Sequence, residues 1–174
     1  MKSKKNWAAL AAVILLVAGA ALWLPKLLDH EPAPSMGYTL LDGRTAHTDD
    51  WRGKVVLVNF WATSCVTCVK EMPALVATHQ KYNAHGYDTV AVAMAYDRPA
   101  YVANFASSRQ LPFQVVLDAS GEIARRFGDV QLTPTTYLIN KRGEIVKRYV
   151  GEPDFAAMHR LVDKLLAEDG PPQT

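Results

Sequence analysis

Both cysteines of this 174-residue chain lie in one short segment, FWATSCVTCVKEMP at residues 60–73. Cys65 and Cys68 are separated by two residues. Two thiols at this spacing can form a structural disulfide, a metal site, or a dithiol that is oxidised and reduced as its function. A structural disulfide stabilises a protein most when it closes a long loop. This pair would close only a few residues, so the structural use is disfavoured.

The residues around the motif predict a strand followed by a helix. Residues 55–61, VVLVNFW, form an apolar run of strand length, and apolar residues at helical spacing predict a helix from about residue 65 to residue 85. The unpaired backbone N–H groups at a helix start favour a thiolate, and cysteines there titrate at roughly 3.5–7.5. Because the thiolate attacks disulfides, Cys65 is the predicted nucleophile. Cys68, one turn later, is predicted to resolve the mixed disulfide.

The rest of the chain alternates strand and helix patterns. Asp42-Gly43 marks a hairpin within residues 38–47. Further strands are predicted at residues 89–95, 113–117, 135–140 and 144–150, and further helices at 99–109, 121–127 and 154–167. Asp154 is the expected N-cap of the last helix. This order predicts an α/β fold, with a mixed central sheet flanked by helices and an N-terminal β-hairpin extension. The cysteines then lie at the carboxyl end of a central strand, where ligands and chemistry gather in open α/β sheets.

The first part of the chain contains an uncharged apolar segment at residues 7–25. As a helix it would extend roughly 28 Å, close to the thickness of a bilayer core. Lysines precede it at positions 2, 4 and 5, which predicts a cytoplasmic N-terminus at residues 1–6. A cleaved signal peptide is the alternative, because Ala18-Gly19-Ala20 has the form of a cleavage site.

These features predict the organisation and location of the chain. A linker is expected at residues 26–36, the catalytic domain at 37–168 and a tail at 169–174. We expect a single-pass protein of the inner, cytoplasmic membrane, with its catalytic domain in the periplasm or otherwise outside the cytoplasm. The net charge of +2 gives no support for nucleic-acid binding, and we expect a monomer.

Four motifs together resemble a known family: GKVVLVNFWAT before the cysteines, Cys-x-x-Cys, KEMP after it, and LTPTTYLIN at residues 132–140. Residues 36–168 resemble the exported TlpA/ResA/CcmG-type thiol-disulfide oxidoreductases of the thioredoxin superfamily. The resemblance implies a thioredoxin fold with a redox-active Cys65–Cys68 disulfide and no other cofactor or metal. It also implies that Pro134 is a cis-proline facing the disulfide, that Thr133 offers backbone hydrogen bonds to a substrate, and that Pro73 kinks the helix.

Glu71 follows the second cysteine by three residues. In ResA-like proteins the acid at this position influences cysteine ionisation, so the resemblance implies that Glu71 takes a proton from Cys68. Thioredoxin keeps a buried aspartate at the position of Asn59, which cannot ionise, and this leaves Glu71 as the nearby acid. The alternative is a surface glutamate that stabilises the first helical turn.

Three more residues are candidates for substrate contact: Trp61 before the motif, and Val66 and Thr67 between the cysteines. Trp61 is expected beneath the site, or as an ordinary core residue. Ser64 and Thr67 depart from the tryptophan and proline that many relatives carry at these positions, so the reduction potential cannot be taken from one relative.

The leading functional hypothesis is an exported disulfide reductase, which a membrane thiol donor re-reduces. The resemblance implies substrates such as the haem-binding cysteines of apocytochrome c or the cysteines of a copper-site assembly protein. A net oxidase is a second hypothesis, and a Cu(I) metallochaperone that uses the same two thiolates is a third.

Overall fold

The structure, a computed structural model, describes residues 30–170. Residues from Glu31 onward belong to one compact unit. The predicted cytoplasmic N-terminus at 1–6, the predicted membrane segment at 7–25 and the end of the predicted tail lie outside the described residues. Between residues 30 and 170, no helix is both long and apolar enough to cross a membrane.

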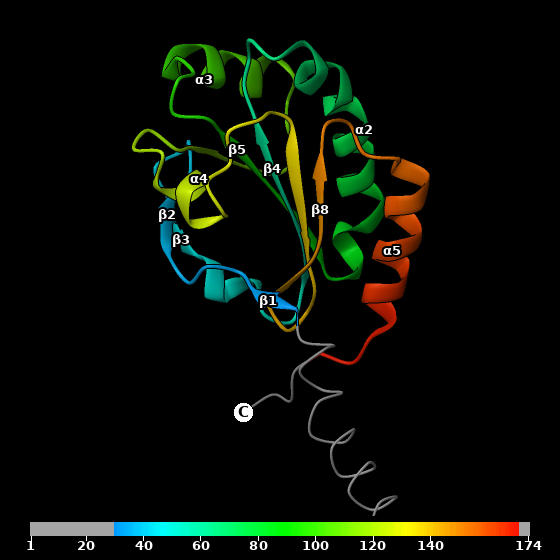
Figure 1. The fold of residues 1–174 in the computed structure, drawn as a ribbon. Helices are drawn as coiled ribbons and strands as arrows, with labels where there is room; N and C mark the ends of the chain where they lie inside the picture. Colours follow the sequence, from blue (N-terminus) through cyan, green and yellow to red (C-terminus); the bar gives the residue numbers. More distant parts are fainter. Residues whose placement is uncertain (1–29, 171–174) are drawn as a thin grey trace, which may run out of the picture. The chain divides into compact units, whose positions relative to one another are not determined.

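A six-stranded mixed sheet forms the centre of this unit (Figure 1), in the order β1-β8-β7-β4-β5-β6. Its strands are β1 (Glu31–Pro32), β4 (Val55–Trp61), β5 (Tyr87–Ala93), β6 (Gln114–Leu117), β7 (Thr135–Ile139) and β8 (Glu144–Val150). β4, β5 and β6 are mutually parallel, whereas β7 and β8 run antiparallel to their neighbours. This is the mixed sheet of the thioredoxin fold that the sequence predicts.

β4 is a central strand because its sequence suits burial on both faces. All seven of its residues are buried. Val55, Leu57 and Trp61 contribute to one core cluster, and Val56, Val58 and Phe60 contribute to the other. A nearly continuous apolar run therefore provides both faces of the sheet with core contacts.

Different elements cover the two faces. The helices are α2 (Val66–Tyr82), α3 (Pro99–Ser108), α4 (Glu122–Arg126) and α5 (Phe155–Ala167), with short 3-10 helices η1 (Thr48–Trp51) and η2 (Asn83–His85). Residues of α2, α3 and α5 join the first core cluster, and residues of α4, η1 and β2 join the second. α2 and α5 lie beside each other on the same side of the sheet in Figure 1.

The predicted hairpin is confirmed. β2 (Gly37–Thr39) and β3 (Thr45–His47) form a two-stranded antiparallel sheet. Gly43 in its turn has φ +87°, a conformation that glycine adopts without a steric penalty.

One predicted boundary is wrong. Residues 26–36 are predicted as a linker, but Glu31 and Pro32 form β1, an antiparallel partner of β8. Ala33 N also donates to Gly143 O at 2.8 Å. Prolines favour extended backbone, which suits an edge strand as well as a linker. The ordered domain therefore begins before residue 37.

The last helix has the N-cap that the sequence predicts. The Asp154 carboxylate accepts a hydrogen bond from Ala157 N at 3.0 Å. We expect Asp154→Ala to lower the free energy of unfolding by about 1 kcal/mol, because one helix-end N–H loses its acceptor. Urea unfolding of the oxidised full chain measures the change. Asp154→Asn is the matched control and should stay near wild type, since asparagine also caps helices. An alanine variant as stable as the asparagine variant would contradict this account.

Candidate active site

Cys65 and Cys68 form a disulfide at the start of α2, with their Cα atoms 5.2 Å apart. Cys65 is the N-cap residue, and its Sγ accepts a hydrogen bond from Cys68 N at 3.2 Å. Cys65 is partly exposed, whereas Cys68 is fully buried. An incoming disulfide can therefore reach the first sulfur but not the second. The arrangement fits the roles predicted for the two cysteines.

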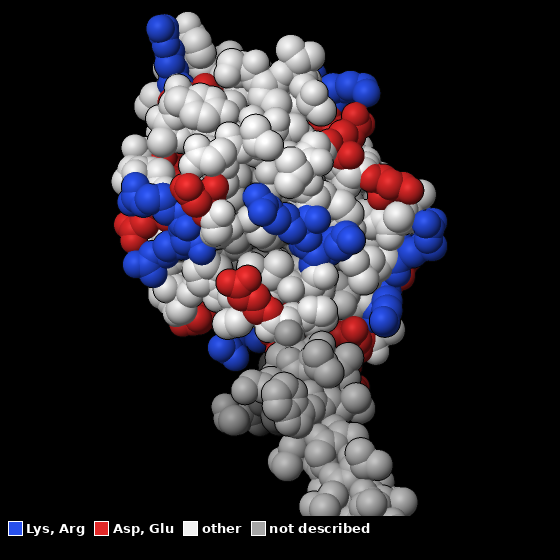
Figure 2. Space-filling view, viewed as in Figure 1, with Lys and Arg blue, Asp and Glu red and all other residues white. Residues whose placement is uncertain are grey.

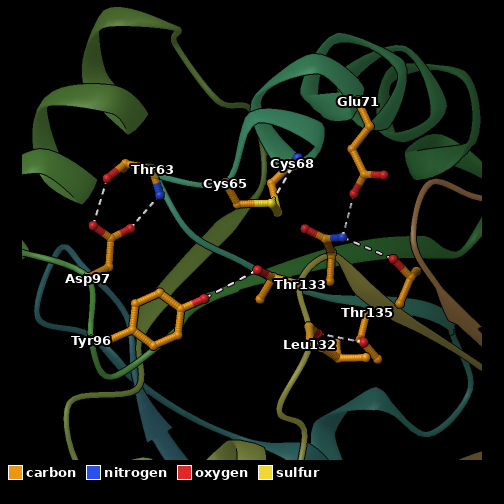
Figure 3. Close-up of a disulfide and its surroundings, with 11 residues drawn as sticks. Thr63, Cys65, Cys68, Glu71, Tyr96, Asp97, Leu132, Thr133 and Thr135 are labelled. Carbon is orange, nitrogen blue, oxygen red and sulfur yellow. Dashed lines mark hydrogen bonds between the residues drawn. A yellow bond between two sulfur atoms is a disulfide. The ribbon is translucent and has the colours of Figure 1, made fainter.

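Two neighbouring elements fix the entry to α2. The carboxyl end of β4 leads through Ala62 to Thr63, and Cys65 N donates back to Ala62 O at 3.1 Å. The backbone N–H and the hydroxyl of Thr63 donate hydrogen bonds to the carboxylate of Asp97, which follows β5 (Figure 3). Asp97 belongs to no sequence motif, and Glu71 was the acid predicted near the cysteines. The signal for Asp97 was its place just beyond a parallel strand, at the sheet edge that also holds the cysteines.

The Thr133–Pro134 peptide bond is cis, as the resemblance implies. Pro134 is buried, and its carbonyl accepts from Gly151 N at 2.8 Å. Thr133 is partly exposed, and its Oγ1 lies 3.2 Å from the hydroxyl of Tyr96 (Figure 3). That Thr133 binds substrate backbone stays a prediction.

Glu71 lies in a buried polar network. It is 1% exposed, so the alternative of a surface glutamate is wrong. Asn59 Nδ2 donates to Glu71 Oε1 at 3.0 Å and to Thr136 Oγ1 at 2.9 Å. Glu71 Oε2 and Asn59 Oδ1 have no hydrogen-bond partner among residues 30–170.

Burial gives Glu71 an unusual proton affinity. Loss of hydration raises its pKa from 4.5 to about 7; the Asn59 hydrogen bond opposes this rise, and the carboxylate of Glu152 adds to it. A carboxyl group with such a pKa exchanges protons near neutral pH, as a proton acceptor for a thiol should.

Of the three candidates for substrate contact, Trp61 does not fit. It is fully buried and packs on Phe105, with ring centroids 5.0 Å apart. Trp61 is a core residue below the site, because the last position of β4 points into the cluster beneath α2 and α3. Val66 is 83% exposed and Thr67 is also exposed, so both are available to a partner.

Exposed apolar side chains gather on the segments around the disulfide. Three of the large exposed apolar residues lie there: Val66 between the cysteines, and Tyr96 and Leu132, which Figure 3 draws in the surroundings of the disulfide. On the face shown in Figure 2, by contrast, acidic and basic side chains are interspersed. The soft ligands at the site are the two cysteine sulfurs, and residues 30–170 hold no group of three or more His, Cys, Asp or Glu that could bind a metal.

The raised pKa of Glu71 makes stability depend on pH. The folded state holds the Glu71 proton more tightly than the unfolded state, so the associated stability is present below about pH 4.5 and is lost as pH rises through about 7. At about 1.4 kcal/mol per pKa unit, the loss is on the order of 3 kcal/mol. Glu71→Gln cannot ionise. We therefore expect its stability relative to wild type to increase by about this amount between pH 4.5 and pH 8.

Urea unfolding of the oxidised full chain at several pH values measures this difference. Glu122→Gln, at an exposed glutamate of α4, is the matched control for loss of a carboxylate. A difference between Glu71→Gln and wild type that stays constant from pH 4.5 to pH 8 would contradict the coupling.

Comparisons with known proteins agree with this geometry. The model of the Redoxin family matches residues 29–163. The chain is 31% identical over 172 residues to the thiol-disulfide oxidoreductase ResA of Bacillus cereus, an alignment that covers 93% of this chain and 98% of the relative. It is 34% identical to ResA of Bacillus subtilis over 127 residues, which cover 73% of this chain and 70% of the relative.

A solved structure is also similar. The crystal structure of a thioredoxin-family thiol:disulfide interchange protein from Chlorobium tepidum matches with a TM-score of 0.73 and 26% identity. The match covers 80% of this chain and 98% of that one. The family match, the relatives and the Cys65–Cys68 pair at the head of α2 together show that this chain belongs to the Redoxin family and is a thiol-disulfide oxidoreductase of the ResA-like kind.

Proposed function

We propose that this protein is an exported protein-disulfide reductase, anchored in the inner membrane by residues 7–25. The observation that carries the proposal is the asymmetry of the cysteine pair. Cys65 is reachable and caps a helix, whereas Cys68 is buried on the same helix as Glu71, three residues before it. Such a pair has a nucleophile, a resolving thiol and a proton acceptor at one site.

The reaction begins with the Cys65 thiolate. It attacks one sulfur of a substrate disulfide, so a bond forms between Cys65 and the substrate while the substrate's own S–S bond breaks. The departing substrate sulfur leaves as a thiolate and takes a proton. At the helix start, Cys68 N already points at Cys65 Sγ and favours its charged form.

The second step releases the reduced substrate. Cys68 gives its proton to Glu71, and the resulting thiolate attacks the Cys65 sulfur of the mixed disulfide. The Cys65–Cys68 bond forms again, and the second substrate sulfur leaves as a thiolate. Two electrons have passed from the enzyme dithiol to the substrate, and a membrane thiol donor must return them by reducing the enzyme disulfide.

The substrate is proposed to be another protein. The exposed apolar residues near the disulfide suit contact with an extended polypeptide, and Thr133 beside the cis-proline can offer backbone hydrogen bonds to it. The cysteines of apocytochrome c or of a copper-site assembly protein are the substrates that the resemblance implies.

The direction of electron flow follows from the reduction potential of the Cys65–Cys68 pair. We expect a value at or below about −230 mV, within the thioredoxin-to-glutaredoxin range, when the full chain in mild detergent is equilibrated with defined thiol buffers. A value near about −120 mV, like that of DsbA, would overturn the reductase proposal and favour a net oxidase.

The roles of the two cysteines are tested by trapping. Cys68→Ser keeps the nucleophile but lacks the resolving thiol, so we expect it to accumulate a mixed disulfide with insulin, a protein with reducible disulfides. Cys65→Ser is the matched control, since it keeps a single cysteine that is buried. Non-reducing gels with mass spectrometry detect the adduct. Equal trapping by both variants would contradict the assigned roles.

A further inference from the structure

The loop between β5 and α3 contacts both chain segments that meet at the disulfide. Its Tyr96 hydroxyl lies 3.2 Å from Thr133 Oγ1, on the segment with the cis peptide bond. Its next residue, Asp97, bonds Thr63, which precedes Cys65 by two residues (Figure 3). One loop therefore connects the two sides of the active site.

Asp97 is held by hydrogen-bond donors. Asp97 Oδ2 accepts from Thr63 N at 2.5 Å, and Oδ1 accepts from Thr63 Oγ1 at 2.6 Å and from Arg98 N at 2.9 Å. In all three bonds the partner donates and the carboxylate accepts. The side chain is also 8% exposed, so a fixed negative charge sits where little water screens it.

We propose that Asp97 is a positioning residue for Cys65: its carboxylate fixes the turn that leads into α2, and its charge disfavours the Cys65 thiolate, which makes the dithiol a stronger reductant. This inference rests on the proposed function in one respect, namely that Cys65 is the nucleophile.

The physical argument combines two opposite effects on one sulfur. The helix start and Cys68 N stabilise the Cys65 thiolate. A negative charge held on the segment that leads into Cys65, through the Asp97–Thr63 bonds, acts in the opposite direction. Whatever stabilises the reduced form makes a dithiol pair more oxidising, as in DsbA, and whatever destabilises it makes the pair more reducing. Asp97 thus offsets part of the helix effect and moves the pair toward reductase behaviour.

Other charged or titratable groups lie on the elements around the disulfide. Glu71 and Lys70 are on α2, with Lys70 paired to Glu152 at 3.1 Å. Arg98 and Tyr96 flank Asp97 on its own loop. A variant of Asp97 leaves all of these groups in place. The difference in Cys65 ionisation between the variant and wild type therefore reports the loss of the Asp97 charge.

The test compares wild type, Asp97→Asn and Asp118→Asn as full chains in mild detergent. Asp118 is the matched control: it is 3% exposed and accepts hydrogen bonds from Ile123 N and Ala124 N, but it follows β6, two strands away from β4. The pH dependence of Cys65 alkylation by iodoacetamide reports the thiolate. Equilibrium with glutathione reports the potential.

For Asp97→Asn we expect the alkylation midpoint to fall by about one pH unit, as for loss of a nearby like charge. We also expect the equilibrium with glutathione to shift about tenfold toward the dithiol, or about 30 mV for this two-electron couple. Asp118→Asn should leave both readouts at wild-type values, whatever its effect on stability. Asp97→Ser is a second neutral variant, and it should shift both readouts in the same direction.

An unchanged or higher midpoint in Asp97→Asn and Asp97→Ser would overturn the proposal. An equal shift in Asp118→Asn would also overturn it, because the effect would then follow from the loss of any buried carboxylate and not from Asp97 in particular. Failure of the proposed function would be seen in the wild-type protein alone. Either Cys65 would not be the cysteine that is alkylated, or the reduction potential would lie near that of an oxidant. Neither result depends on the shift between variants.

Discussion

The bond from Cys68 N to Cys65 Sγ is the contact on which the rest of the site depends. It exists because the first cysteine occupies the N-cap position, where side chains such as serine or aspartate usually accept backbone N–H groups. A sulfur in that place is a structural cap and also the atom that we propose as the nucleophile. The sheet positions this contact, since the central strand β4 ends four residues before Cys65 and the chain continues into α2.

The same strand explains the buried acid. Asn59 lies on the face of β4 that carries Val55, Leu57 and Trp61, and this face packs beneath α2. A polar residue there needs partners, because an unpaired buried polar group costs on the order of 1–3 kcal/mol. Glu71 and Thr136 provide them, although one oxygen of Asn59 and one of Glu71 have no partner within the described part of the chain. The fold thus buries a carboxyl group at the position of the proposed proton acceptor.

Much of this architecture was predictable from the sequence. The apolar run at residues 55–61 predicted the bounds of β4, Asp42-Gly43 predicted the hairpin, and Asp154 predicted the last N-cap. Each of these patterns is local in the sequence. The strand predicted at residues 89–95 begins earlier, at Tyr87, since its length is set by pairing with β4 and not by its own residues. β1 was missed for a similar reason: a two-residue strand exists only through its partner.

In the active site, too, features that depend on contacts between distant segments could not be predicted from the sequence. The cysteines and the cis-proline carry motifs, so they were predictable. Asp97 carries none, and its role depends on β5 lying parallel beside β4, which brings its loop to Thr63. The structure therefore gives two carboxyl groups near one disulfide different environments, as burial and hydrogen bonds can do for a pair of acids. Glu71 has one donor and a pKa near 7, which suits the transfer of a proton. Asp97 has three donors, which suits a fixed charge. In the division of roles that we propose, Glu71 takes the proton of Cys68, and Asp97 sets how readily Cys65 holds a negative charge.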